Sequence, residues 1–495
     1  MFIANIAALG HFNQEFYMAK ANITLLSEKE IQSIHDASLV ILRDTGILVH
    51  HEEGLKQLGQ AGAKIDKQKK IARLPEKLIM DSVKKAGKKY ILHGRNAEKQ
   101  ARFGYGDFVH LSSPGQYIWV DTRTNKRRPA TVRDAEDAIR LGDALENITI
   151  VGAMAQPADI SENLRPVFLT GLLVEGTSKP SRAWVHNGKQ AKYVLEIYKA
   201  AAGGADALRR RPMTEAFIEP ISPLQITGNG LDVAIEFARA GQPVGIGPMA
   251  MASGTAPATL AGTLAEENAE ILAALVLIQL FAPGTAICYG GIPHIMDPRT
   301  SICSFGSPEQ GLMGVAMVQM ARFYGLPVYI NVGLTDAKVP DAQAGIEKGT
   351  TMLLGALAGA DMFGHCGICG TDHGASLAWL YFDNETANYV NRVARGFEVD
   401  KETLATEVVN TVGPGGNFLA EEHTVKHFRR EFWLTGPAWT RQSFDGWESQ
   451  GSKSFAEQIA DEVERILSTH KAEPIDPGLA REVDKIVESA RRELS

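Results

Sequence analysis

The sequence lacks several features that define large classes of proteins. No hydrophobic run reaches the ~18–20 residues that a membrane-spanning helix needs. Four cysteines in 495 residues are too few for a disulfide framework, which is typical of a chain kept in a reducing compartment. The net charge of −7 and the lack of a long Lys/Arg run argue against a surface for nucleic acid or anionic lipid. We therefore expect a cytoplasmic protein that binds neither nucleic acid nor a membrane.

The N-terminus also lacks the pattern of a secretory signal peptide. Residues 1–25 have no early positively charged segment, and His11, Asn13 and Glu15 interrupt their apolar residues. We interpret this stretch as an N-terminal extension.

Two common phosphate-binding motifs are missing. No GxxxxGK[ST] motif occurs, and no GxGxxG motif opens the first of the β–α repeats described next. The stretch Gly413–Gly416 is rich in glycine but has no predicted strand before it, so we interpret it as a loop.

From about residue 105, short β-rich apolar runs alternate with longer, mostly helical segments. Eight such runs occur, at Phe108–Leu111, Thr149–Met154, Ala183–His186, Thr214–Glu219, Pro243–Pro248, Thr285–Gly290, Leu326–Val332 and Asp361–Cys366. Their spacing of about 25–45 residues leaves room for one crossover helix each. A doubly wound sheet is the competing arrangement. Because eight is the number of strands that closes a barrel, we predict an α/β protein with a TIM (β/α)8 barrel over residues 105–375.

The predicted barrel is flanked by two other regions. Residues 26–104 are predicted to form an N-terminal helical cap with small strands, and Ser27 with Glu30 forms a capping box at its first helix. Residues 376–495 are predicted to be mainly helical. The clearest predicted helices of the barrel and the C-terminal region are Asp134–Leu145, Asn229–Ala240, Leu260–Phe281, Pro308–Tyr324, Ala342–Ala358, Glu457–Ser468 and Gly478–Glu493.

The active site of a TIM barrel lies at the C-terminal ends of its strands. The candidate side chains there are Trp184, Phe217, Glu219, Tyr289, Tyr329 and Asn331. Each also has a plain structural explanation, such as filling a barrel layer or pairing with a charge. Their concentration at the strand ends favours a substrate pocket.

The last predicted strand runs into the segment His365–Gly374, which reads HCGICGTDHG. Its cysteines, Cys366 and Cys369, have CxxC spacing and could hold zinc together with a histidine or Cys288. However, no second CxxC follows, and a thioredoxin-like redox pair would open a helix in a small βαβ unit. Simple packing of two small side chains is the third interpretation, and spacing alone leaves all three open.

Several segments, in this order, resemble the trimethylamine methyltransferase family. They are Ile31–Ser38, Thr45–Ile47, His93–Asn96, Arg127–Thr131, Thr335–Lys348 and His423–Arg429. The resemblance runs from about residue 26 to the helical tail, and it rests on the order of the segments because none is specific alone. It implies a TIM barrel that presents a methylated amine to a separate corrinoid protein.

The archaeal trimethylamine enzymes of this family carry pyrrolysine late in the barrel, and this sequence contains none. The segment His365–Gly374 takes the corresponding region, judged by its distance from Phe382–Glu385. The sequence therefore resembles the non-pyrrolysine branch, whose characterised activities are on quaternary amines. This implies transfer of a methyl group from a quaternary amine, with glycine betaine as the leading candidate, to the cob(I)alamin of a separate corrinoid protein.

When a quaternary ammonium ion gives up a methyl group, the amine leaves as a neutral molecule and needs neither a proton nor a metal. We therefore expect a site that positions the substrate without a metal. Aromatic faces suit a trimethylammonium head. The residues expected to bind it are Tyr329, Tyr289, Phe217 and Trp184, with Glu219 or Asp372 as counter-charge and Asn331 as a polar neighbour. A substrate carboxylate is expected to bind His365, His373 or the backbone amides between Gly370 and Gly374.

The corrinoid cofactor is expected to come from the partner, and none is expected to be bound by this chain. Proteins that bind cobalamin through a lower histidine ligand carry the pattern D-x-H-x-x-G, and no histidine here has an aspartate two residues before it. We also expect a homo-oligomer. A zinc-dependent corrinoid methyltransferase that uses Cys366 and Cys369, and a non-catalytic betaine-binding barrel, are the alternative functions.

Overall fold

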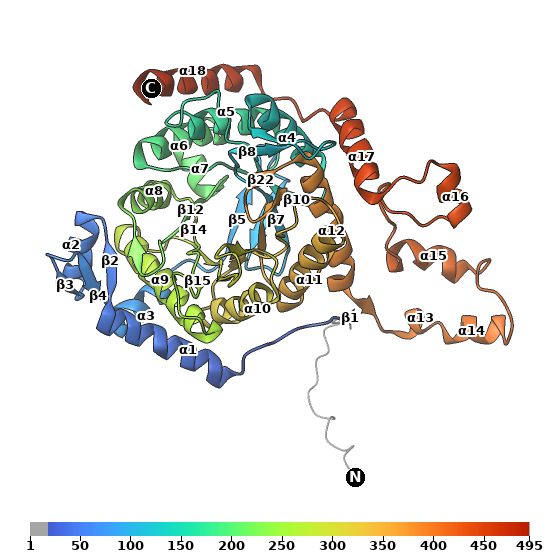
Figure 1. The fold of residues 1–495 in the computed structure, drawn as a ribbon, viewed down its shortest axis with the longest axis horizontal. Coiled ribbons are helices and arrows are strands. Elements are labelled where there is room, and N and C mark those ends of the chain that lie inside the picture. The colour runs from blue at the N-terminus through green and yellow to red at the C-terminus, as the bar shows by residue number, and fades with distance from the viewer. Residues whose placement is uncertain (1–17, 495) are drawn as a thin grey trace, which may run out of the picture.

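A computed structural model describes residues 18–494 and shows an eight-stranded parallel sheet at the centre of the molecule (Figure 1). In chain order its strands are β7 (Val109–Ser112), β10 (Ile148–Gly152), β11 (Ser181–Arg182), β12 (Ala216–Ile218), β14 (Val244–Ile246), β16 (Ile287–Gly291), β19 (Val328–Ile330) and β20 (Met362–Cys366). The first strand, β7, pairs with both β10 and the last strand, β20. Neighbours therefore follow the chain order of a barrel, and the predicted TIM barrel is confirmed.

The third strand differs from the prediction. It comprises Ser181 and Arg182, which pair with Val151 and Gly152, and not the apolar run Ala183–His186. The apolar run follows the strand without regular secondary structure and leads to Asn187, whose side chain caps α6. The prediction failed because a charged residue was not expected to lie in a buried strand.

Helices surround the sheet (Figure 1). They are α4 (Val132–Ala144), α5 (Arg165–Gly176), α6 (Gly188–Ala202), α7 (Ala205–Arg210), α8 (Gly228–Arg239), α9 (Leu260–Phe281), α10 (Pro308–Phe323), α11 (Ala342–Ala358) and α12 (Leu377–Arg395). The five barrel helices predicted from the sequence are confirmed, with shifts of at most a few residues at their ends. Helix α12 follows β20 and packs against α11 and α4, so the eighth β–α repeat extends past residue 375.

The N-terminal region closes one end of the barrel. Its elements are β1 (Met18–Ala19), α1 (Glu28–Val40), a π-helical turn (Ile41–Thr45), β2 (Ile47–Val49), α2 (Glu52–Gln60), β3 (Lys64–Asp66), β4 (Ile71–Arg73), α3 (Glu76–Lys85), β5 (Tyr90–His93) and β6 (Gln100–Phe103). The predicted capping box at Ser27 is present. Tyr90 and Phe103 of the β5–β6 hairpin stack at 4.3 Å and pack inside the barrel against Leu111, so the opposite, C-terminal end of the strands is the open one.

Short strands rise from the loops that follow the barrel strands. One four-stranded sheet contains β21 (Ile368–Cys369), β22 (Gly374–Ala375), β8 (Ile118–Val120) and β9 (Arg127–Pro129), and a three-stranded sheet contains β15 (Met251–Ala252), β17 (His294–Met296) and β18 (Cys303–Ser304). Strand β13 (Gln225–Ile226) joins the N-terminal strands β2, β4 and β3.

The C-terminal region has two parts. The first part projects from the barrel and contains β23 (Phe397–Glu398), α13 (Lys401–Leu404), α14 (Thr406–Val412), α15 (Glu422–Glu431) and α16 (Phe444–Ser449) (Figure 1). The second part returns to the barrel as α17 (Phe455–Thr469) and α18 (Pro477–Leu494), which contain the two C-terminal helices predicted from the sequence. Among the helices of residues 18–494, none combines the length and the apolar character that crossing a membrane requires.

Candidate functional site

Two aromatic rings cross the interior of the barrel. Phe217 on β12 and Tyr329 on β19 lie edge to face, with their ring centroids 5.1 Å apart. Glycines on the neighbouring strands make room for them: a Cβ atom at Gly247 would come within 2.3 Å of Phe217, and one at Gly364 within 2.3 Å of Tyr329. The absence of a side chain at Gly247 and Gly364 therefore makes room for the two rings.

Trp184 and His365 complete the aromatic group. The Trp184 ring lies edge to face with Phe217 at 6.4 Å and with His365 at 5.9 Å. Burial lowers the pKa of His365 to about 3, and the nearby Arg182 acts in the same direction. His365 is therefore neutral at physiological pH, and its Nε2 atom is buried without a hydrogen-bond partner.

A buried ion pair lies deeper in the barrel. Arg182 Nη1 donates to Glu215 Oε1 at 2.7 Å, and the hydroxyl of Tyr90 donates to the other carboxylate oxygen at 2.8 Å. The two charged side chains are 2% and 0% exposed. Burial raises the pKa of Glu215, and Arg182 opposes this shift by favouring the charged carboxylate.

Arg182 has unused hydrogen-bonding capacity. Its Nε and Nη2 atoms are buried and have no acceptor, and its guanidinium carbon lies 5.1 Å from the centroid of Phe217. Buried donors without an acceptor are costly, so an anionic ligand group would be stabilised here. Arg182 was not predicted from the sequence, because a lone arginine before an apolar run carries no pattern of its own.

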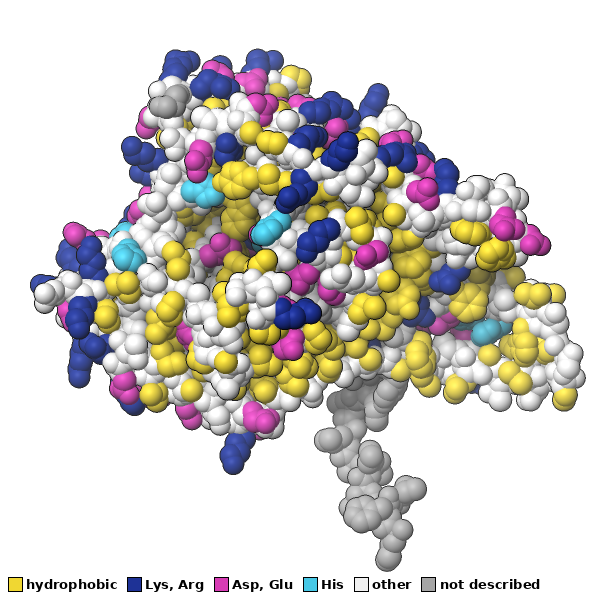
Figure 2. Space-filling view, viewed as in Figure 1, with side chains coloured by type: hydrophobic (Ala, Val, Ile, Leu, Met, Phe, Trp, Pro, Cys, Tyr) yellow, Lys and Arg dark blue, Asp and Glu magenta, His cyan; other side chains and the backbone are white. Residues whose placement is uncertain are grey.

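Two carboxyl groups lie nearer the open end. Burial and the neighbouring Asp372 raise the pKa of Glu219 to about 7. Burial raises the pKa of Asp372 to about 6, and a hydrogen bond of 2.5 Å from Gln116 Nε2 to Asp372 opposes the shift. A cation beside these groups would restore their charge. Figure 2 shows the surface hollowed over the barrel, with hydrophobic side chains in the hollow and acidic ones near it.

Tyr289 does not belong to this group, which corrects the prediction. Side chains of a strand alternate between its two faces, and on β16 the inward positions are those of Cys288 and Ile292. Tyr289 faces the surrounding helices instead, and its hydroxyl donates to Asn268 of α9 at 2.9 Å. Asn331, by contrast, accepts a hydrogen bond of 2.8 Å from the hydroxyl of Tyr329.

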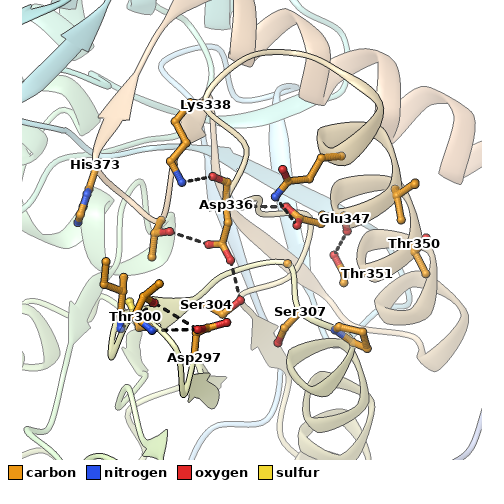
Figure 3. Close-up of a pocket in the computed structure, with 18 of the residues that line it drawn as sticks. Asp297, Thr300, Ser304, Ser307, Asp336, Lys338, Glu347, Thr350, Thr351 and His373 are labelled. Carbon is orange, nitrogen blue, oxygen red and sulfur yellow. Dashed lines mark hydrogen bonds between the residues drawn. The ribbon is translucent and has the colours of Figure 1, made fainter.

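Gly370 and His373 line a separate pocket of about 820 Å³ between the β17–β18 hairpin and the helices α10 and α11 (Figure 3). His373 is exposed there, so the structure does not bring it into the aromatic group. Gly374 lies in β22, where a Cβ atom would come within 2.7 Å of Val120. Trp184, Phe217 and Tyr329 do not line this pocket, and the binding of a carboxylate by His373 stays a prediction.

The turn that carries Asp372 has an unusual backbone. Gly370, Thr371 and Asp372 all have positive φ angles, of 60°, 61° and 62°. Non-glycine residues in this region cost about 1–3 kcal/mol each and persist only where the surroundings hold them. Here Asp336 holds the turn, because its carboxylate accepts hydrogen bonds from Thr371 Oγ1 at 2.6 Å and from Ser304 Oγ at 2.6 Å (Figure 3).

The cysteines of the predicted CxxC pair are buried in the protein. The predicted continuation of the last strand into this segment is confirmed, since Cys366 ends β20 and Cys369 ends β21. Burial raises the pKa of Cys369 to about 11 and raises that of Cys366 further, so both thiols stay protonated at neutral pH. Within residues 18–494, no group of three or more His, Cys, Asp and Glu side chains is arranged to hold a metal ion.

Comparisons with known proteins connect this site to a family. The family model described as trimethylamine methyltransferase (MTTB) matches residues 7–495. This chain belongs to the trimethylamine methyltransferase family. The predicted family is thus confirmed, and the match begins before the segments that carried the prediction.

Relatives in the trimethylamine methyltransferase family carry two kinds of name. The trimethylamine methyltransferase MttB of Desulfitobacterium hafniense (strain DSM 10664 / DCB-2) is 34% identical over 468 residues, which cover 94% of each chain. That of Methanosarcina barkeri (strain Fusaro / DSM 804) is 32% identical over 481 residues, covering 94% of this chain and 95% of its own. A glycine betaine methyltransferase of D. hafniense (strain Y51) is 30% identical over 472 residues, covering 95% and 98%. Family membership therefore does not show which amine is the substrate of this chain.

Solved structures support the fold. The hydroxylamine complex of MtmB aligns with a TM-score of 0.51 and 10% identity, covering 96% of this chain and 88% of that chain. The Methanosarcina barkeri monomethylamine methyltransferase (MtmB) aligns with a TM-score of 0.50 and 9% identity over the same shares.

Proposed function

We propose that this member of the family transfers a methyl group from a quaternary amine, with glycine betaine as the leading candidate, to the cob(I)alamin of a separate corrinoid protein. The observation that carries the proposal is the order of groups along the barrel. An aromatic group lies between an inner cationic side chain, Arg182, and an outer pair of carboxyl groups, Glu219 and Asp372.

This order matches the two charges of a betaine. Glu215, which holds Arg182, directly precedes β12, and Glu219 directly follows it. Each lies two residues from Phe217, which is about 6.6 Å in extended chain. A carboxylate directed inward would meet the unused donors of Arg182. The trimethylammonium head would then face outward, where a docked partner can reach a methyl group.

The reaction needs little from the protein beyond positioning. Cob(I)alamin, when supplied by the partner, is the nucleophile that accepts the methyl group. The carbon–nitrogen bond breaks, and its electron pair stays on nitrogen as a neutral tertiary amine, so no proton has to be delivered. Trp184, Phe217 and Tyr329 exclude water and face the ammonium group, and Glu219 supplies a compensating charge. A tertiary amine substrate would need activation, and the sequence contains no pyrrolysine to supply it.

Two tyrosines on neighbouring strands provide a matched test. Tyr329 and Tyr289 are both fully buried, and each hydroxyl donates to an asparagine, but only Tyr329 faces the aromatic group. Tyr329→Leu and Tyr289→Leu should lower the unfolding temperature by similar amounts. Only Tyr329→Leu should raise the KM for the quaternary amine, by about 5- to 30-fold, because about 1–2 kcal/mol of cation–π attraction is lost. Equal changes in KM would contradict the proposed pocket.

The pH dependence of kcat/KM tests the counter-charge. Because the pKa of Glu219 is about 7 in the free protein, kcat/KM should rise about tenfold between pH 6 and pH 8 as the carboxyl group ionises. Glu219→Gln should lower the plateau and leave only a shallow dependence near pH 6 from Asp372. Glu266→Gln is the control, since burial also raises the pKa of Glu266 to about 7, but this residue lies on α9. A Glu219→Gln profile identical to that of the unaltered protein would exclude this role.

The strained turn gives a third test. Asp336→Asn removes the negative charge and replaces one of the two accepting oxygens with a donor, so the hydrogen bonds from Thr371 and Ser304 are weakened and the turn that carries Asp372 should become mobile. We expect KM to rise about tenfold and kcat to change less, because a hydrogen bond to a charged group is worth about 1.5–3 kcal/mol. Asp297→Asn is the matched control, because Asp297 caps a turn of the same hairpin region and does not contact Thr371. Steady-state kinetics of both variants measure the difference.

A further inference from the structure

An apolar groove of about 880 Å³ lies between α11 and α12, where the projecting part of the C-terminal region leaves and rejoins the barrel. The large side chains that line it include Leu353, Phe382, Tyr389, Trp439 and Phe455. Of the described residues along the groove, only Asp341 is charged, and its carboxylate caps the first turn of α11. Figure 2 shows hydrophobic side chains gathered over this part of the surface. Apolar grooves of this kind mark binding sites.

Two glycines of α11 keep one wall of the groove flat. Gly345 and Gly349 both line it, and a Cβ atom at either position would meet nothing within 4 Å. Glycine inside a helix costs about 0.5–1 kcal/mol relative to alanine, and no neighbour among the described residues requires it here. Glycine also permits the close approach of another piece of chain. The groove therefore has the shape of a site for a further polypeptide segment.

The beginning of the described chain is fixed beside this groove. Strand β1 pairs with β23, which directly follows α12 (Figure 1). Gly396 permits the pairing, because a Cβ atom there would collide with the carbonyl oxygen of Ala19. The chain then reaches the end of α11, where the amide of Ile23 donates to the carbonyl oxygen of Leu357 at 3.1 Å. Residue 18 thus lies against the ends of the two helices that form the groove.

The segment before β1 is long enough to cover the groove. Along α11 the groove extends from Ala342 to Leu353, and eleven residues of helix measure about 17 Å. Leu353 lies one turn, about 6 Å, before Leu357. Seventeen residues measure about 26 Å as a helix and about 58 Å when extended, so residues 1–17 can reach the far end of the groove in either form.

The sequence of this segment suits an apolar groove. It reads MFIANIAALGHFNQEFY, and Glu15 is its only charged side chain. Bulky apolar residues recur every three or four positions, at Phe2, Ile6, Leu9, Phe12 and Phe16. This is the spacing of the anchors with which a segment binds in a hydrophobic groove. The family match begins at residue 7 and so includes most of the segment.

We propose that residues 1–17 bind in this groove of their own chain, with their bulky apolar side chains against its aromatic rings. The attachment at β1 favours this occupant over a separate molecule, because a segment tethered beside its site is present at an effective concentration of about 1 mM. A dissociation constant of about 100 μM for the free peptide would then keep the groove covered about ten times as often as open. Bound in this way, the segment joins the beginning of the chain to α17, since Phe455 opens that helix.

Hydrogen–deuterium exchange of the full chain tests the contact. The backbone amides of residues 2–17 should exchange about tenfold more slowly than in a free peptide of the same sequence. Leu9→Glu puts a charge at an anchor position, and Gly349→Glu puts one in the groove where there is room for a side chain, so each should abolish the slowing. Exchange at the free-peptide rate in the unaltered chain, or slow exchange that persists in Gly349→Glu, overturns the proposal.

Matched variants separate a lost contact from a lost fold. Ala7→Glu puts the same charge between two anchor positions, and Val40→Glu changes a 45% exposed apolar side chain on α1, away from the groove. Both should keep the slow exchange, and circular dichroism should show equal helix content in all variants. The slowing should also be the same at about 1 μM and about 50 μM protein, because the contact lies within one chain. Slowing that disappears on dilution would assign the groove to a second copy and overturn the proposal.

Discussion

Replacing both members of the buried pair, in the variant Arg182→Met/Glu215→Gln, should lower kcat/KM for glycine betaine about 100-fold and leave that for choline changed by less than about threefold. Glycine betaine has a carboxylate that the free donors of Arg182 can bind, and choline does not. A charge-assisted bidentate contact in a dry site accounts for an effect of this size. Side-by-side kinetics with the two substrates measure the ratio, and an equal loss for both would show that Arg182 does not select a carboxylate.

The single variant Arg182→Met separates this role from stability. It leaves Glu215 buried without its cation, which costs about 3–5 kcal/mol of folding free energy. The double variant removes the uncompensated charge and should regain most of that loss in a thermal unfolding experiment. Arg182→Lys keeps the charge but cannot present two parallel donors, so it should fold well and still discriminate poorly between the two substrates.

An equally large effect on stability is expected at Lys348. Its ammonium group lies 2.8 Å from the carboxylate of Asp383, and both side chains are fully buried. Lys348 also donates to the carbonyl oxygen of Ile368, and the Gly367 amide donates to Asp383, so the pair supports the segment after β20. Lys348→Met should lower the free energy of unfolding by about 3–5 kcal/mol, because Asp383 is left as an unpaired buried charge.

The pH dependence of that variant identifies the cause. An unpaired buried carboxyl group has a raised pKa in the folded state, so stability falls as pH rises above the value of about 4 in the unfolded chain. The loss caused by Lys348→Met should therefore shrink below pH ~4, and the double variant Lys348→Met/Asp383→Asn should regain most of it at pH 7. Lys401→Met is the control: Lys401 also pairs with a carboxylate, but it is 90% exposed, so little change is expected. A Lys348→Met protein as stable as the unaltered one would contradict the account.

The barrel could be predicted because its signal is distributed over the chain. The prediction of a barrel rests on eight apolar runs at regular spacing, so it stays correct when one of them is assigned wrongly. The third strand was assigned wrongly in this way. Individual side chains are less predictable. Tyr289 and Cys288 are neighbours on one strand, and a shift of one residue decides which of them faces the pocket.

Other parts of the site could not be predicted from the residues next to them in the sequence. Arg182 is meaningful only because the fold brings Glu215 and Tyr90 to it from distant segments. His373 lies one residue from Asp372, yet His373 is exposed whereas Asp372 accepts a hydrogen bond from Gln116. The segment Thr335–Lys348, recognised as a family resemblance, contains two structural anchors, Asp336 and Lys348, whose partners could not be read from the chain.

The most direct test of the central claim is a methyl-transfer assay with the purified chain, its corrinoid partner protein held as cob(I)alamin, and either glycine betaine or trimethylamine. The absorbance spectrum distinguishes cob(I)alamin from methylcobalamin. We predict methylcobalamin and one equivalent of dimethylglycine from glycine betaine, and none from trimethylamine. Methylation from trimethylamine, with no reaction from glycine betaine or any other quaternary amine, would contradict the proposal.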